Sequence, residues 1–278
     1  MNFNFAMLQY LKTRINQMAK FFPIFSLIVL CFSTQLLVSE ELSLFYQKNT
    51  DFARTAYEEK LVGHAKSSFE KSLILESKLT GNYFFEVSES LNWRTATIPH
   101  YHELSDLTKI NFYHLLNNLC SLEGASHLHI GLLGADSFIS ALYGNQNLLN
   151  QQIGVDWFQE CPKTIFLANC EQYLDPEKYQ VLESGCFDLD KSWIKDPIDI
   201  YFYDADHSLM GHEKAITYYN DVYADVFIAV IDDWDCPWIR GATFKAFTKL
   251  NYCILYQNAI PSIGVDNGQY IAVIRKPS

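Results

Sequence analysis

The sequence predicts an α/β fold: a doubly wound, mainly parallel, seven-stranded sheet with an antiparallel hairpin at one edge and a helical extension at the N-terminus. In the second half of this 278-residue chain, short apolar runs rich in Val, Ile, Tyr and Phe alternate with segments of helical periodicity. Such runs are typical of buried parallel strands. The last two runs lack a helix-length segment between them, which predicts the antiparallel hairpin.

The elements can be assigned in order. Residues 42–106 form a helical extension, with apolar residues at helical spacing over 42–79, a candidate strand at 82–88 and a loop at 94–105 that contains His100 and His102. A helix at 107–122 opens the main domain, which we place at 107–278. Strands are expected at 127–130, 152–156, 179–183, 198–204, 226–231, 252–256 and 270–274, and helices at 137–143, 158–174, 209–223 and 239–250.

Residues 1–41 form a basic and apolar leader. Lys12, Arg14 and Lys20 precede an apolar stretch at 21–39 that is long enough to cross a bilayer, although several polar residues weaken it. The segment is typical of a membrane anchor or a signal peptide; the alternative is a non-native leader read from an upstream start codon. We expect membrane association through 21–39, with a cytoplasmic catalytic domain if the protein is active.

Composition narrows the classes of function. Hydrophobic residues make up 49% of the chain and aromatic residues 15%, enough for a substantial core. The net charge of −11 without a basic patch disfavours nucleic-acid binding and leaves small structured substrates open. The seven cysteines show neither a CxxC pair nor zinc-ligand spacing, so we expect mostly buried free thiols.

Acidic residues end two of the predicted strands. Asp204, Asp206 and His207 follow the run at 198–204, and Asp232 and Asp233 follow the next one. Ligands of open α/β sheets bind outside the carboxyl ends of the strands. Carboxylates suit Mg²⁺ or Ca²⁺, and a neighbouring imidazole suits proton abstraction. The alternatives are that these aspartates only cap strand ends and that His207 only hydrogen-bonds to Asp206.

The loops after the first three strands carry candidate ligand-binding residues. Gly131 opens the loop to the helix that contains Ser137; a glycine there allows a ligand to approach the backbone, although the loop is neither a GxGxxG fingerprint nor a P-loop. Asp156 ends the second strand, where it could bind ribose hydroxyls or cap the following helix. Asp188 follows the third strand and could face an adenine amino group or cap a turn.

Together these residues resemble class I S-adenosylmethionine-dependent methyltransferases, over about 107–276. The segments 199–219 and 231–243 are similar to a branch related to metal-dependent sugar O-methyltransferases. The resemblance implies the Rossmann-like methyltransferase fold and S-adenosylmethionine as cofactor. It also implies three sets of site residues: Mg²⁺ bound by Asp204, Asp232 and Asp233; His207 as the general base; and the cofactor bound by Gly131, Ser137, Asp156 and Asp188.

The chain departs from this pattern at three places. His129 stands where the family has Glu, Ala135 stands where it has a second glycine, and the segment 265–268 replaces a Trp-Trp-Asn-Gly run. Ala135 adds a methyl group where the cofactor would pass, and alanine disfavours positive φ.

The function that we expect is metal-assisted O-methylation of a hydroxyl on a small, polar, sugar-like substrate. One alternative is a degenerate, non-catalytic methyltransferase-fold domain, tethered to a membrane as a binding or scaffold module. Another is a metal-dependent hydrolase or glycosyltransferase, because fold does not fix chemistry.

Overall fold

A computed structural model describes residues 53–79, 106–261 and 268–277. The predicted leader, the candidate strand at 82–88 and the loop with His100 and His102 lie outside the described residues. The chain divides into two compact units, Met1–Ala56 and Tyr57–Ser278, and the three predicted domains stay predictions. Among the described residues, no helix combines the length and the apolar character needed to cross a membrane.

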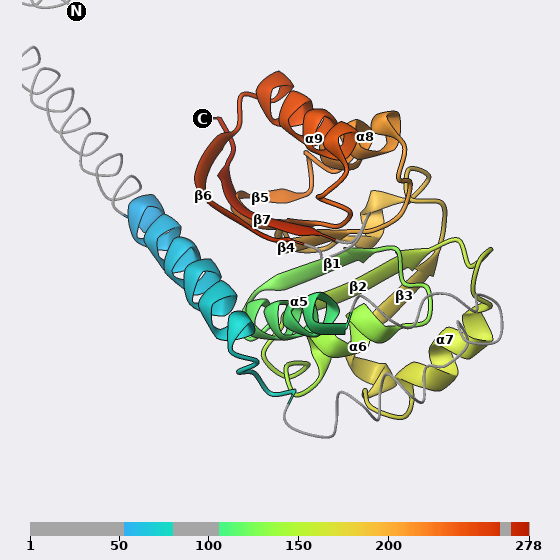
Figure 1. Cartoon of the computed structure of the whole chain (residues 1–278). Helices are drawn as coiled ribbons and strands as arrows, with labels where there is room; N and C mark the ends of the chain where they lie inside the picture. The colour runs from blue at the N-terminus through green and yellow to red at the C-terminus, as the bar shows by residue number, and fades with distance from the viewer. Residues whose placement is uncertain (1–52, 80–105, 262–267, 278) are drawn as a thin grey trace, which may run out of the picture. The chain divides into compact units, whose positions relative to one another are not determined.

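One seven-stranded sheet organises the second unit (Figure 1). Its order is β3-β2-β1-β4-β5-β7-β6, and β7 runs antiparallel to both neighbours, whereas the other described pairs are parallel. This confirms the predicted fold class, a Rossmann-like methyltransferase fold. The strands are β1 Ser126–Ile130, β2 Gln151–Asp156, β3 Gln180–Glu183, β4 Ile198–Tyr203, β5 Tyr223–Ile231, β6 Cys253–Ile260 and β7 Gln269–Arg275.

The strand order reverses between β1 and β4. β1 pairs in parallel with β2 on one side and with β4 on the other, so the helices that follow β1 and β4 leave toward opposite faces. A crevice at the carboxyl ends of such strands is where open α/β sheets bind ligands. All the site residues predicted from the sequence follow the carboxyl ends of β1 to β5.

Helices cover both faces of the sheet (Figure 1). They are α5 Asp106–Leu119, α6 Asp136–Leu142, α7 Lys163–Cys170, α8 Leu209–Tyr218 and α9 Pro237–Lys249, with short 3₁₀ turns at Pro176–Lys178 and Lys191–Trp193. The prediction of a helix from 158 to 174 was wrong at its start. Phe158 has a positive φ of 55°, and α7 begins only after Pro162, whose fixed φ of −57° fits the N-cap position.

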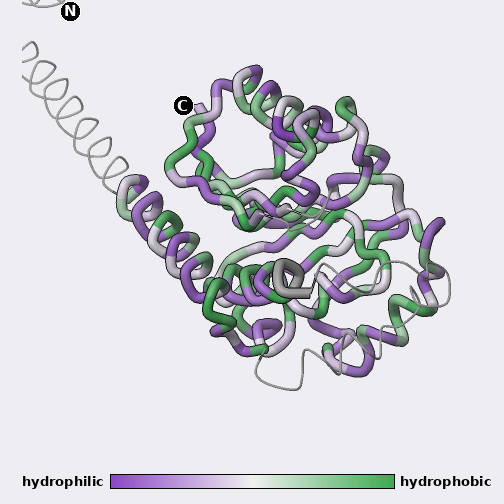
Figure 2. Tube along the Cα trace, viewed as in Figure 1, coloured by the Kyte–Doolittle hydropathy of each residue, from purple (hydrophilic) through white to green (hydrophobic). Residues whose placement is uncertain are grey.

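The core consists of two layers, one on each face. Phe112, Phe138 and Phe166 from α5, α6 and α7 pack with Phe202 of β4 on one face, and residues of α8 and α9 pack on Tyr201, Tyr203 and Phe227 on the other. Figure 2 shows hydrophobic residues along the strands and, at intervals, along the helices. The six cysteines within the described ranges are free thiols and four of them are buried, as predicted for those positions.

Residues 57–73 form a helix that belongs to this unit. Leu61, Ala65 and Phe69 are buried, one on each turn, which agrees with the helical spacing of apolar residues in the sequence. Leu73, which continues that spacing, is exposed instead.

Candidate functional site

Three aspartates meet where β4 and β5 end. The backbone N–H of Asp204 donates to the Ile130 carbonyl at 2.9 Å, and that of Asp232 donates to the Tyr203 carbonyl at 3.1 Å. These bonds continue the parallel ladder beyond the strands and hold Asp204 and Asp232 at the same edge of the sheet. Asp233 follows directly, in a left-handed conformation with φ of 55°. The sequence correctly predicted that these carboxylates would lie together.

His207 lies between two of these carboxylates. Its Nδ1 contacts Oδ2 of Asp233, and its Nε2 lies 3.7 Å from Oδ1 of Asp204. The side chain of His207 is 54% exposed and that of Asp233 only 13%, so the imidazole faces solvent while its anchor is buried. The alternative in which His207 pairs with Asp206 is not found: His207 contacts Asp233 and Asp204, and Oδ1 of Asp206 accepts the backbone N–H of Ser208 at 2.9 Å.

These contacts change the charge of the imidazole. The hydrogen bond to Asp233 raises the pKa of His207 to about 9, against the opposing effect of partial burial, and the charges of Asp204, Asp233 and Asp232 act in the same upward direction. In this arrangement His207 is a cation at neutral pH. A general base must be neutral, so His207 could act as one only after losing this proton.

Asp232 is the most constrained member of the group. Its Oδ1 accepts a hydrogen bond from Nε2 of Gln269, at 2.9 Å. Burial, and after it the charges of Asp204 and Asp233, raise the pKa of Asp232 well above its usual value. No sequence pattern indicates Gln269, because the contact joins the end of β5 to the start of β7, 37 residues later.

The donor chemistry of this group suits a hard divalent cation, and a cation would relieve the repulsion that raises the pKa of Asp232. The side chains as placed do not form such a centre: within the described part of the chain, no group of three or more His, Cys, Asp or Glu side chains is arranged to hold a metal ion. The predicted Mg²⁺ site therefore stays a proposal.

The predicted cofactor residues near β1 and β2 contact the chain itself. Gly131 has a φ of +89°, and a Cβ at this position would lie 1.6 Å from the carbonyl oxygen of Asp204. Glycine is needed here because β4 continues against the loop, and not only for ligand access as the sequence suggested. Gly131 thus touches the acidic group from the neighbouring strand.

Asp156 holds the same loop in place. Its Oδ2 accepts the backbone N–H groups of Leu132 at 2.7 Å and Leu133 at 3.1 Å. Its Oδ1 accepts that of Phe158 at 2.6 Å. Both carboxylate oxygens therefore bind the chain, although a carboxylate has about four acceptor positions in all. A ribose at Asp156 would share these oxygens with the backbone.

Ser137 and Asp188 are placed differently again. The Oγ of Ser137 lies 3.0 Å from Nε2 of His129, and both side chains are buried. Burial keeps the pKa of His129 well below its usual value. Asp188 lies in an exposed turn, where its backbone N–H donates to the Gly185 carbonyl at 3.0 Å.

Backbone strain is concentrated at this edge of the sheet. Four of the six non-glycine residues with positive φ among those described follow β1, β2 or β5: Leu133, Ala135, Phe158 and Asp233. Ala135, at 83°, lies in the left-handed region that favours glycine. Such outliers cost roughly 1–3 kcal/mol each and cluster at functional sites. They support a functional role for the carboxyl edge.

Two further side chains belong to this region. His212 of α8 is buried, its ring centre lies 6.4 Å from that of His207, and neither ring nitrogen has a hydrogen-bond partner. Trp238 of α9 donates its indole N–H to the His207 carbonyl at 3.4 Å and stays half exposed. For Trp238 the sequence left two roles open, shaping the substrate mouth and aromatic packing, with packing favoured; it indicated nothing for His212.

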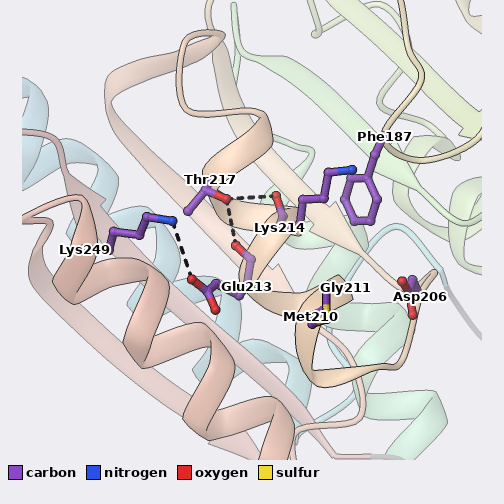
Figure 3. A pocket seen from close by; sticks show the side chains of 8 residues that line it. All are labelled: Phe187, Asp206, Met210, Gly211, Glu213, Lys214, Thr217 and Lys249. Atoms are coloured by element: carbon purple, nitrogen blue, oxygen red, sulfur yellow. Dashed lines mark hydrogen bonds and ion pairs between the residues drawn. The ribbon is translucent and has the colours of Figure 1, made fainter.

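A pocket of about 420 Å³ adjoins the site along α8 (Figure 3). Asp206 and Met210 lie at its end nearest His207, and Glu213 pairs with Lys249 at 3.6 Å along its wall. Lys214 lies over the ring of Phe187, 4.4 Å from its centre. None of the predicted cofactor, metal or base residues lines this pocket, so it adjoins the candidate site without containing it.

No family model and no curated protein matches the chain. Solved structures with a similar fold include an O-methyltransferase from Bacillus cereus in complex with SAH (16% identity, 71% of this chain and 93% of that chain, TM-score 0.49). A putative O-methyltransferase from Klebsiella pneumoniae is 14% identical; the match covers 70% of this chain and 91% of that chain, with a TM-score of 0.49. The N-methyltransferase NodS from Bradyrhizobium japonicum WM9 is 11% identical; the match covers 62% of this chain and 98% of that chain, with a TM-score of 0.47. Fold similarity at this level does not fix the substrate.

Proposed function

We propose that this protein is an S-adenosylmethionine-dependent O-methyltransferase whose acceptor is a hydroxyl on a small, polar, sugar-like molecule. The observation that carries the proposal is the position of His207 between Asp204 and Asp233, at the carboxyl ends of adjacent strands of this fold and open to solvent. His207, once neutral, is a proton acceptor, and the two carboxylates orient its imidazole. All three side chains lie where this fold binds ligands.

In the reaction, Asp233 orients the imidazole through Nδ1 and leaves Nε2 to face the acceptor hydroxyl. His207 is a cation at neutral pH, so it must first release one proton to solvent; as a neutral imidazole it would then take the proton of that hydroxyl. S-adenosylmethionine, when bound, would supply the methyl group and leave as S-adenosylhomocysteine, and the product would be a methyl ether. Asp204, Asp232 and Asp233 would hold Mg²⁺, which when bound supplies Lewis-acid lowering of the hydroxyl pKa. Positioning of the two reactants supplies most of the rate.

On the cofactor side, Asp156 and the loop from Gly131 would receive S-adenosylmethionine, with Ser137 and Asp188 beside them. Because three of the about four acceptor positions of Asp156 already accept backbone N–H groups, a ribose hydroxyl would bind to the one that remains. We also propose that the stretch at 21–39 associates with a membrane and leaves the catalytic unit in the cytoplasm, where S-adenosylmethionine is made available.

The first test is calorimetric titration of the full chain with S-adenosylmethionine, with and without Mg²⁺. We expect binding in the micromolar range, and tighter acceptor binding when Mg²⁺ is present. A folded chain that binds no S-adenosylmethionine under either condition would contradict the proposal and would favour the non-catalytic binding module.

A second test addresses the base and the carboxylates. We expect His207→Gln and Asp204→Asn to lower turnover at least about a hundredfold, the lower range for general-base catalysis, with unchanged S-adenosylmethionine affinity. The matched control is Asp196→Asn, because Asp196 is an exposed aspartate that precedes β4 at the opposite edge of the sheet. Full activity in both site variants would exclude this mechanism.

A further inference from the structure

The two tryptophans of the segment that follows β5 differ in environment. Trp234 is 7% exposed and stacks on Tyr270, with ring centres 3.9 Å apart and planes 14° from parallel. Trp238, four residues later at the start of α9, is 49% exposed. Trp234 is therefore part of the core, and Trp238 has aromatic surface left for another molecule.

The indole of Trp238 is hydrogen-bonded to the backbone of His207, the proposed base. Its N–H donates to the carbonyl oxygen of His207 at 3.4 Å. This contact satisfies the one polar atom of the side chain, so the accessible remainder is apolar ring. The contact also ties α9 to the backbone of the turn after β4.

Apolar side chains on the same turn extend this surface. Leu209 and Met210 open α8, two and three residues after His207, and are 48% and 79% exposed. Met210 also lines the end of the pocket near Asp206 (Figure 3). Asp204 and Asp233 therefore contact the imidazole of His207, and exposed apolar side chains follow His207 directly in the chain.

We propose that Trp238 is the specificity-determining platform of the acceptor site: the apolar face of a six-membered ring lies on the indole while a ring hydroxyl points to Nε2 of His207. This deepens the proposed function and rests on it. The shared chemistry is a ring with an apolar face and adjacent hydroxyl groups. A pyranose offers such a face through its C–H bonds, and a catechol offers it through its π system.

The acceptor must suit both the polar and the apolar side chains of the site. Asp204, Asp233 and His207 favour polar, oxygen-bearing edges, whereas Trp238 and Met210 favour an apolar surface. Ligand sites in general combine an apolar lining with a few polar groups that fix orientation. An acyclic polyol would satisfy the first half of the site and leave the indole unused.

The test uses binding, so that it does not depend on turnover. Saturation-transfer NMR on the full chain would follow catechol and methyl α-D-mannopyranoside, each with Mg²⁺ present. The variants are Trp238→Leu, which keeps apolar volume without an aromatic face, and Trp238→Phe, which keeps a ring. The matched control is Trp193→Leu: Trp193 is also 49% exposed, but its carbonyl accepts the side chain of Gln151, at the amino end of β2.

We expect Trp238→Leu to weaken binding of the preferred ring about tenfold, or about 1.4 kcal/mol, a value within the range for stacking on aromatic side chains. Trp238→Phe should retain most of the affinity, and Trp193→Leu all of it. The stronger of the two probes identifies the ring class. Equal binding by Trp238→Leu and Trp193→Leu, or no binding of either ring to the wild type, would overturn the proposal. Calorimetry with S-adenosylmethionine on the same samples tests the cofactor separately, so the proposed function can fail independently.

Discussion

The two halves of the carboxyl edge use their polar residues in different ways. Around β1 and β2, Asp156 and Ser137 contact the chain's own groups, and Gly131 is fitted against the Asp204 carbonyl. Around β4 and β5, by contrast, carboxylates are brought together. Burial, and after it the charges of Asp204 and Asp233, raise the pKa of Asp232, and the hydrogen bond to Asp233 raises that of His207. In the first half, Asp156 and Ser137 have partners within the chain; in the second half, carboxylates lie close enough to repel one another.

This difference indicates what each half contributes. Clustered carboxylates cost stability unless a cation or substrate offsets the repulsion, so their presence at β4 and β5 points to a ligand. Satisfied groups around β1 and β2 give stability and set the loop geometry. Substitutions there should first affect folding, and substitutions around His207 should first affect chemistry.

Gly131→Ala should have the largest effect on stability. The added Cβ would overlap the Asp204 carbonyl, 1.6 Å away, in a backbone conformation with φ of +89° that alanine disfavours. We expect a loss of at least about 3 kcal/mol in the free energy of unfolding, measured by urea denaturation. The control is Gly241→Ala in α9, where a Cβ meets nothing within 4 Å; it should gain up to about 1 kcal/mol from helix propensity. Equal stability of the two variants would show that β4 does not pack on the loop.

The sequence predicted the strands well for a physical reason. Each apolar run must be buried on both faces of a parallel sheet, and polar or turn residues end it, so composition and length locate β1 to β5 within a few residues. The position of the three clustered aspartates can be predicted from the strands, because the carboxyl ends of parallel strands lie at one edge of the sheet. Asp204, Asp232 and Asp233 could therefore be grouped without a structure.

Other features depend on contacts between distant segments, which a sequence pattern does not encode. Gly131 is a glycine because of the Asp204 carbonyl, and Asp232 is held by Gln269. Trp234 and Trp238 share one short segment, yet one is core and the other is exposed, because α9 begins between them. Spacing alone could not separate these roles.

Asp156→Asn tests whether the β1 and β2 half is mainly structural. The amide keeps the shape but replaces one acceptor oxygen with a donor, so either the Leu132 and Leu133 N–H groups or that of Phe158 lose their partner. Such a loss costs about 1–3 kcal/mol in the free energy of unfolding. Asp188→Asn is the control, since Asp188 is exposed and a surface change of this kind stays within about 0.5 kcal/mol. If both variants unfold at the wild-type urea concentration, Asp156 is not holding the loop, and the contrast between the two halves disappears.

His127 and His207 should affect the pH dependence of stability in opposite directions. Burial lowers the pKa of His127 in β1 to about 3, and neither of its ring nitrogens has a partner. Because the unfolded value of about 6.5 lies higher, the unfolded chain binds the extra proton below that pH. His127 therefore removes up to about 1.4 kcal/mol of stability per pH unit as pH falls below 6.5. His127→Leu should flatten the stability profile between pH 5 and 6.5 in urea denaturation.

His207→Gln should change the dependence of stability on pH at higher pH, between about 6.5 and 9. The folded pKa of His207, about 9, lies above the unfolded value, so its pairing with Asp233 stabilises the fold fully below pH 6.5 and progressively less up to pH 9. The variant should lose stability at pH 6 and match the wild type above pH 9.5. The loss should be small, because the imidazole is half exposed and solvent screens the pair. If both variants shift the profile in the same pH range, the two imidazoles have similar environments, and the division of the edge into a satisfied half and a charged half is wrong.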